Sequence, residues 1–185
     1  SILISLLFLS CNNNNKPNII IIVADDLGYG DLSIFGNKNI NTPNIDKLGN
    51  EGLVLTDFHS NGSVCSPTRA ALLTGKYQQR VGVGGVITAK NHRDKGLSTD
   101  EITFANIAKK SGYKTGIFGK WHLGYDPMFS PVNQGFDEFR GFVSGNVDYH
   151  SHIDQEGYED WWEDDELKKE IGYSTDLITK HSIDF

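Results

Sequence analysis

The hydrophobic pattern of this chain alternates between short apolar runs and amphipathic segments. NIIIIVADD, residues 18–26, is rich in β-branched residues, has polar flanks and ends in two aspartates. A continuous run of this kind is typical of a strand buried on both faces of a largely parallel sheet. GLVLTDFHS, residues 52–60, and YKTGIFGKWH, residues 113–122, are further strand candidates. The pattern therefore predicts strands at three places along the chain.

Helix start and stop signals lie between these runs. Thr42 and Pro43 provide an N-cap and a first helical position for NIDKLGNEG, and Gly52 is expected to end that helix. RAALLTG is expected to form a second helix, which Gly75 closes. The sequence thus predicts one short surface helix before the second strand and one helix directly after it.

Two further helices are predicted later in the chain. Thr99 is expected to cap DEITFANIAKKSG, in which four apolar positions approximate one face. These positions are Ile102, Phe104, Ile107 and Ala108. YSTDLITKHSIDF opens a helix at Ser174 or Thr175 and stops in mid-pattern, so we expect a truncation there, and the chain beyond Asp126 is expected to be loop-rich up to that helix. This order of elements predicts the α/β class, with a doubly wound, largely parallel central sheet flanked by helices.

Composition and charge narrow the function. The chain has 185 residues, of which 38% are hydrophobic and 22% charged, as expected for a globular protein of about one domain. Its formal net charge of -7 argues against a nucleic-acid partner, because nucleic-acid binders normally carry a basic face.

The first residues have the pattern of an export signal. SILISLLFLSC starts at Ser1 rather than at Met and is an apolar run too short to span a bilayer as a mature helix. Its end at Cys11 resembles a bacterial lipobox, with Phe8 where leucine is usual, and the asparagine-rich stretch after it resembles a polar tether. We therefore expect residues 1–16 to be a truncated signal peptide, lipobox and tether. The protein is then expected to be exported to the bacterial periplasm or the outer membrane, with a lipid anchor at Cys11; the alternative is an ordinary buried strand or helix.

Asp25 and Asp26 stand where the first predicted strand ends. Ligands collect at the carboxyl ends of parallel strands, and adjacent carboxylates favour a hard cation such as Ca²⁺ or Mg²⁺. The alternative is a pair of solvated turn aspartates. The GYGD that follows is a poor dinucleotide motif, because the third glycine is missing and two carboxylates would face the pyrophosphate.

Cys65 lies in SVCSPTRAALLTGKY, at the start of a predicted helix, where backbone N–H groups and the helix dipole favour anions. A structural cysteine is normally surrounded by apolar residues, whereas this one stands in a polar turn. The other cysteine, Cys11, lies in the export segment, so a disulfide is not expected. Arg69 follows four residues later, which is too close for a phosphatase-type thiolate loop, and zinc would need further Cys or His nearby.

Taken together, these motifs resemble the type I sulfatases, a family in the alkaline-phosphatase superfamily. Cys65-Ser66-Pro67-Thr68-Arg69 with the AALLTGKY after it matches the family signature, in which the cysteine is oxidised to Cα-formylglycine. The supporting matches are Asp25-Asp26, TPNIDKL, GKWHLG and QGFDEFRGF, in the family's order. The resemblance implies an alkaline-phosphatase-like fold and makes residues 17–185 the N-terminal part of a sulfatase catalytic domain.

The resemblance also implies a mechanism. The aldehyde formed from Cys65 hydrates to a gem-diol, one hydroxyl attacks sulfur, and the second then expels sulfate, so one hard displacement becomes two steps. Asp25 and Asp26 would ligate Ca²⁺ rather than Mg²⁺, and the residue at position 65 would touch the same ion. Arg69 would hold the gem-diol. A maturation enzyme that generates formylglycine is an implied partner.

By the same resemblance, two residues of GKWHLG complete the site. Lys120 would bind sulfate and His122 would stabilise the diol or relay protons. They are two residues apart on a predicted strand, so we expect them to point the same way. Ser144 is a further candidate for a polar contact. The family's downstream Asp-Asn pair, histidine and lysine have no counterpart in these 185 residues.

Several alternatives stay open. The preferred substrate is a sulfated sugar or polysaccharide, with aryl sulfates as surrogates. Phosphodiester and phosphonate monoester hydrolases of the same superfamily use a similar pocket, and an inactive exported binding protein is a third possibility. His150 and His152 in DYHSH are expected in a substrate loop or an ordinary surface rather than in a metal site, and YEDWWEDDE is expected to pack a loop or to line a sugar subsite.

Overall fold

The computed structural model describes residues 16–185, which divide into two compact units that meet in the sequence at Val54 and Leu55. The apolar run at the start, Cys11 and nearly all of the tether lie outside the described residues, so the export and lipid-anchor hypotheses stay predictions. Within the range 16–185, no helix has the length and apolar character needed to cross a membrane.

The first unit contains one α-helix and two 3₁₀ turns among its described residues. The helix α1 spans Pro43–Glu51, with Thr42 at the N-cap position and Gly52 directly after its end, which confirms the predicted bounds. The 3₁₀ turns cover Tyr29–Asp31 and Ser33–Phe35.

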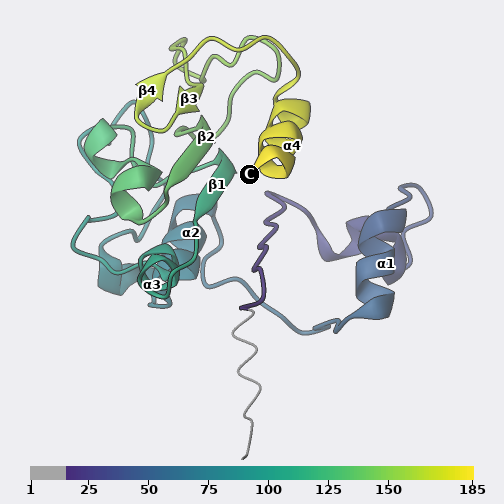
Figure 1. Ribbon diagram of the computed structural model, residues 1–185. Helices are drawn as coiled ribbons and strands as arrows, with labels where there is room; N and C mark the ends of the chain where they lie inside the picture. The colour runs from purple at the N-terminus through teal and green to yellow at the C-terminus, as the bar shows by residue number, and fades with distance from the viewer. Residues whose placement is uncertain (1–15) are drawn as a thin grey trace, which may run out of the picture. The chain divides into compact units, whose positions relative to one another are not determined.

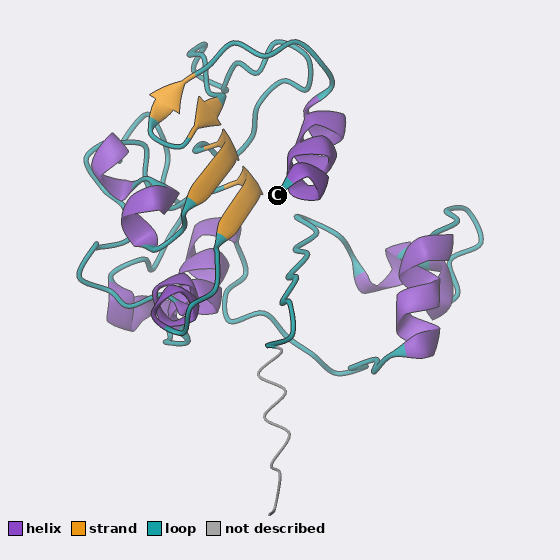
Figure 2. Cartoon of the chain, in the orientation of Figure 1, coloured by secondary structure: helices purple, strands orange, loops and turns teal. Residues whose placement is uncertain are grey.

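The strand predicted for residues 18–26 is absent from the structure. Residues 18–24 have no regular secondary structure, and Ile20 and Ile22 are 83% and 81% exposed. The strand predicted for 52–60 is absent too, with Leu53 85% exposed. A strand needs backbone partners along its edges, and no other described segment pairs with either run. Figure 2 accordingly shows every strand in the second unit.

The second unit is built on a four-stranded mixed sheet in the order β1-β2-β3-β4 (Figures 1 and 2). β1 (Gly116–Lys120) and β2 (Glu138–Phe142) run parallel in register from Gly116↔Glu138 to Lys120↔Phe142. β3 (Trp162–Glu163) and β4 (Glu166–Leu167) are added antiparallel. β1 confirms the middle of the predicted strand 113–122, whereas β2, β3 and β4 lie in the region expected to be loop-rich.

Three α-helices belong to this unit. α2 spans Cys65–Thr74 and ends at Gly75 in the left-handed conformation, so the helix begins earlier than the predicted RAALLTG. α3 spans Phe104–Lys110, and α4 spans Ser174–Asp184, opening at Ser174 as expected. α4 packs against β1 and β2 (Figure 1). Three 3₁₀ turns complete the elements: Gln78–Val81, Pro127–Phe129 and Pro131–Gln134.

The cap of α3 corrects the prediction. Thr103 rather than Thr99 caps the helix: its Oγ1 accepts from the backbone N of Asn106 at 3.2 Å, and Asn106 Oδ1 accepts from the backbone N of Thr103 at 2.9 Å. This reciprocal pair needs a polar residue three positions after the cap. Thr99 has Ile102 at that position, which offers no acceptor, and Ile102 is 54% exposed rather than part of a buried face.

The core of the second unit joins the sheet to α2 and α3. Trp121, Leu123 and Phe139 are among its largest fully buried apolar side chains, and Trp121 Nε1 donates to the carbonyl of Phe129 at 2.9 Å. The other buried members are Ala70, Leu73, Val81, Val83, Ile87, Leu97, Ala105, Phe136 and Val143. This core holds the start of α2 and the carboxyl ends of β1 and β2 in one body.

Candidate active site

Cys65 is the first residue of α2. The preceding residue, Val64, is extended (φ -143°, ψ 165°), and Cys65 is half-buried and makes no disulfide. Pro67 is tolerated because it lies in the first turn, where backbone N–H groups have no partner inside the helix. The orphan N–H groups and the helix dipole favour an anion at this end.

Ser66 ties this helix start to a neighbouring loop. Its side chain is fully buried, and Oγ accepts from the backbone N of Ile87 at 3.1 Å. The carbonyl of the same Ile87 accepts from His122 Nε2 at 2.9 Å. Since a carbonyl only accepts, Nε2 carries a proton, which fixes the tautomer of the neutral ring. A two-bond chain through Ile87 therefore connects the residue after Cys65 to His122.

Arg69 connects α2 to the sheet. Its Nη1 donates to the backbone carbonyl of Lys120 at 2.5 Å, across 51 positions of sequence. Lys120 is the last residue of β1, and both side chains are half-buried. The structure therefore brings together two of the residues predicted from separate motifs.

His122 lies just beyond the carboxyl end of β1 and is 3% exposed. Its backbone has φ +58°, in the left-handed region, and its N–H donates to the carbonyl of Val143 at 3.2 Å. Side chains alternate between the two faces of a sheet only within a strand, and β1 ends at Lys120, two residues before His122. The common orientation expected for Lys120 and His122 thus stays a prediction.

A pocket of about 240 Å³ lies beside His122. Its wall includes Ile87, the Ser144–Gly145 step after β2, and polar side chains from two loops. The polar loop members are Thr88, Lys90, Asn91, Asn146, Asp154, Gln155 and Glu156. The pocket therefore opens where β1 and β2 end, which is where parallel sheets bind ligands.

Tyr125 also lines this pocket, and burial raises the pKa of its phenol above the ordinary value of 10.0. Contacts with the backbone at Ala89 and Gly145 lower it in part, while the carboxylates of Asp160 and Asp154 raise it further. At neutral pH the phenol therefore keeps its proton and offers the pocket a neutral hydroxyl.

Asp25 and Asp26 lie in an exposed turn of the first unit, and Asp26 has φ +58°. Adjacent carboxylates are suitable donors for a hard cation. Within the described residues there is no cluster of three or more His, Cys, Asp or Glu side chains that would complete a metal site. The two aspartates belong to the first unit and the other four predicted residues to the second, so their joint role stays a prediction.

The histidines of DYHSH have separate surroundings. His150 is exposed and its ring lies 5.4 Å from that of Tyr173, whereas His152 is 4% exposed and stacks on Trp161 at 4.4 Å. Ser144 is buried at the pocket wall, but its Oγ donates to the carbonyl of Asn146 at 2.8 Å.

Three residues of this region, Ser66, Ile87 and Tyr125, were not predicted from the sequence. Ser66 stands inside the Cys65–Arg69 signature, so the sequence draws attention to its position. Its hydrogen bond to the backbone N of Ile87 cannot be predicted from that position. Ile87 makes both of its hydrogen bonds in this chain through backbone groups, which no side-chain pattern marks.

Comparison with known proteins places this chain in a family. Solved structures that are similar to this chain are sulfatases of alkaline-phosphatase-like α/β fold. The family model named Sulfatase matches residues 17–185, and the chain belongs to the sulfatase family.

Relatives and solved structures agree with this assignment. The chain is 48% identical over 129 residues to arylsulfatase A of Bos taurus, covering 69% of this chain and 25% of that protein. It is 43% identical over 146 residues to arylsulfatase H of Homo sapiens, covering 71% and 25%. The chain thus spans about a quarter of the length of these curated relatives.

Two solved structures hold sugars. Ps i-CgsB in complex with k-i-k-neocarrahexaose is 34% identical with a TM-score of 0.85, over 92% of this chain and 41% of that one. BT4656 in complex with its substrate D-glucosamine-2-N,6-O-disulfate is 33% identical with a TM-score of 0.74, over 92% and 31%.

Proposed function

We propose that the full-length protein hydrolyses sulfate esters, with the residue at position 65 as nucleophile after oxidation of Cys65 to Cα-formylglycine. The observation that carries the proposal is the arrangement around the start of α2. Arg69 contacts the end of β1 at Lys120, and the chain through Ile87 connects Ser66 to His122. Residues from two separate motifs thereby lie around one helix N-terminus that favours an anion.

In this proposal each side chain has a distinct task. One hydroxyl of the hydrated aldehyde attacks sulfur and the alcohol of the ester leaves. The second hydroxyl then loses its proton, the C–O bond to sulfate breaks, and sulfate leaves as the aldehyde re-forms. Arg69 and Lys120 add positive charge, which offsets the repulsion between an anionic ester and the nucleophile. His122, whose Nε2 is held by Ile87, stabilises the diol or relays protons.

Ca²⁺ is the proposed metal, with Asp25 and Asp26 among its ligands. Their carboxylates are charged oxygen donors, which a hard divalent cation prefers. The ion would neutralise charge on the sulfate and would also touch the residue at position 65. Further ligands would have to come from beyond the residues described.

A sulfated carbohydrate is the proposed substrate. The support is the pocket beside His122, lined by amide, hydroxyl and carboxylate groups, together with the sugars bound by the two solved structures cited above. A maturation enzyme acting on the Cys65–Arg69 signature and a lipid anchor at Cys11 complete the proposal. Export to the periplasm or the outer membrane rests on the sequence of residues 1–16 alone.

The test uses full-length protein made with a maturation system. Mass spectrometry of the tryptic peptide that contains Cys65 should show a lighter, hydrazide-reactive aldehyde, and the protein should hydrolyse an aryl sulfate faster than an aryl phosphonate ester. Faster phosphonate hydrolysis would assign the protein to the other branch of the superfamily. Full sulfatase activity with an alkylatable thiol at Cys65 would contradict the formylglycine mechanism.

A further inference from the structure

The acidic and aromatic segment 158–166 contains a buried carboxylate. Asp160 is 3% exposed, and its two oxygens accept three hydrogen bonds. Oδ1 accepts from the backbone N of Val143 at 3.0 Å and from Trp162 Nε1 at 2.6 Å, and Oδ2 accepts from the backbone N of Ser144 at 2.8 Å. Burying a carboxylate is costly unless its oxygens are bonded, and here both are.

The backbone that Asp160 holds forms the pocket wall. Val143 follows β2 directly, and its carbonyl accepts from the backbone N of His122 at 3.2 Å. Ser144 and Gly145 line the pocket. Gly145 packs so closely on the His122 ring that an added Cβ would lie 2.9 Å from Cε1 and 3.0 Å from Nε2. A small shift of this backbone would therefore displace the His122 ring.

We propose that Asp160 is a positioning residue for this site: it holds the Val143–Ser144 backbone so that the wall beside it keeps His122 in place. The inference rests on the proposed function, in which His122 takes part in the reaction. Asp160 reaches the pocket lining through the backbone N of Ser144, and its charge also helps to raise the pKa of the Tyr125 phenol in that lining. Its remaining side-chain bonds are to the Val143 backbone and the Trp162 indole.

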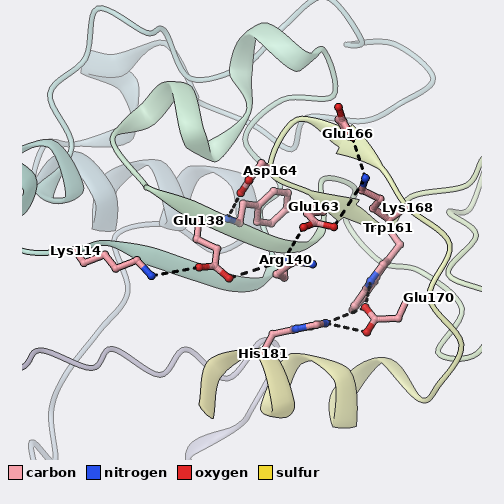
Figure 3. Close-up of polar contacts among 11 residues, drawn as sticks. Lys114, Glu138, Arg140, Trp161, Glu163, Asp164, Glu166, Lys168, Glu170 and His181 are labelled. Carbon is pink, nitrogen blue, oxygen red and sulfur yellow. Dashed lines mark hydrogen bonds and ion pairs between the residues drawn. The ribbon is translucent and has the colours of Figure 1, made fainter. Parts of the chain in front are cut away.

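Asp164, in the same segment, provides a matched control. It contacts β2, because its Oδ1 accepts from the backbone N of Phe139 at 2.9 Å and its own N donates to the Phe139 carbonyl at 2.8 Å. Figure 3 shows the Asp164 side chain beside the sheet. Phe139 lies early in β2, and neither residue lines the pocket. Asp164→Ala therefore removes one carboxylate bond to the backbone of β2 and adds strain at φ +58°, without touching the pocket wall.

The primary variant is Asp160→Asn in the full-length, matured protein. An amide has only one acceptor oxygen, and its NH₂ group cannot accept a hydrogen bond. That NH₂ group would face either the Ser144 N–H or the Val143 N–H and the Trp162 indole, so at least one buried donor would be left unpaired. We expect kcat for an aryl sulfate, normalised to the measured aldehyde content, to fall about tenfold with KM within about twofold. Asp164→Ala should keep kcat within about twofold while lowering the thermal midpoint. Equal kcat losses in the two variants would overturn the proposal.

Two further measurements keep the inference decidable. Trp162→Phe removes only one donor to Asp160, so this variant should fold and lower kcat about two- to threefold. If Asp160→Asn does not fold, an unchanged kcat in Trp162→Phe would count against the proposal. Hydrogen exchange of the 143–146 backbone should speed up about tenfold in Asp160→Asn and stay unchanged in Asp164→Ala. If the wild-type protein hydrolyses no sulfate ester, the proposed function fails, and unchanged exchange in Asp160→Asn would separately overturn the role of Asp160.

Discussion

The two units of this chain carry equally distinctive motifs but differ in burial. None of the described residues of the first unit, which are residues 16–54, is buried, although the apolar run NIIIIV lies among them. The second unit buries Trp121, Leu123 and Phe139 in one core. An apolar segment therefore forms a strand only where another segment pairs with its backbone and apolar side chains pack against it.

The units also differ in what holds them together. In the first unit, Asp46 joins α1 to the preceding 3₁₀ turn by accepting from Ser33 Oγ at 2.6 Å, Thr42 Oγ1 at 2.8 Å and the backbone N of Ile34 at 3.0 Å. These are local polar contacts, within about a dozen positions of sequence. In the second unit, bonds such as Arg69 to Lys120 connect distant segments through the core. In the second unit, tertiary packing therefore holds candidate site residues such as Arg69.

The largest expected effect tests whether the chemistry belongs to the second unit. Cys65→Ala in the full-length, matured protein should lower kcat at least about ten-thousandfold, because it removes the precursor of the nucleophile. The thermal midpoint should change little, since Cys65 is only half-buried and the change opens no large cavity. Steady-state kinetics and a thermal melt measure both quantities. A variant that keeps one tenth of wild-type activity would remove Cys65 from the reaction.

The second prediction compares the units in stability. Phe139→Ala should lower the free energy of unfolding by about 3–5 kcal/mol, because Phe139 is fully buried in the core. Ile20→Ala should change it by less than about 0.5 kcal/mol, because Ile20 is 83% exposed. Chemical denaturation gives both values. A loss above about 2 kcal/mol at Ile20 would show that this side chain packs against residues other than those described.

The third prediction concerns whether the first unit contributes metal ligands to the reaction. Asp25→Asn or Asp26→Asn should weaken Ca²⁺ binding and lower sulfatase turnover about a hundredfold, because even the loss of an outer-shell partner costs 10–100-fold at many metal sites. The melting temperature without Ca²⁺ should stay the same, since both residues lie in an exposed turn. Calorimetry with Ca²⁺ and activity assays test this. Normal turnover of either variant in a chelator would make them ordinary turn residues.

The smallest expected effect is a pH dependence of the free energy of unfolding, to which each unit contributes through one carboxyl group. The Ser33 hydroxyl, with Thr42 and the Ile34 N–H, lowers the pKa of Asp46 below its ordinary value of 3.8. The Lys109 ammonium, with Thr115, lowers the pKa of Asp137 in the second unit. Both pKa values are lower in the folded state than the ordinary value of 3.8. Each carboxylate therefore stabilises the folded state at pH values above 3.8, and this stabilisation is lost as the pH falls through the folded-state pKa.

An NMR titration of the two side-chain carboxyl groups measures these pKa values. Lys109→Met should return the Asp137 pKa toward 3.8 and leave that of Asp46 unchanged. A shift at both positions would mean that the two units titrate together. An Asp137 pKa that does not respond would show that Thr115, rather than Lys109, holds the carboxylate.

Local signals in the sequence placed most of the helix ends. Pro43 and Gly52 bound α1 as predicted, Gly75 ends α2, and Ser174 opens α4. Such signals work because a helix satisfies most of its backbone groups within one segment. The cap of α3 was misplaced because Thr99 and Thr103 are both capping residues. The partner three positions later distinguishes them: Asn106 can complete the pair and Ile102 cannot.

Strands depended on information that lies outside their own segments. The run 18–26 has a stronger strand pattern than Glu138–Phe142, yet only the latter forms a strand, because β1 pairs with it in parallel register. A strand bonds to another part of the chain, so composition predicts its suitability and not its partner.

The sequence by itself determined the identity of the chemical groups: a cysteine at a helix start, an arginine one turn later, adjacent aspartates, and a lysine and histidine in GKWHLG. Their side chains and close spacing along the chain are local properties, which a sequence displays directly. The tertiary structure alone decided that Arg69 meets Lys120, that Ile87 connects Ser66 to His122, and that Asp160 holds the wall beside that ring. These contacts use backbone groups, which every residue possesses, and only the packing of the core determines which of them meet.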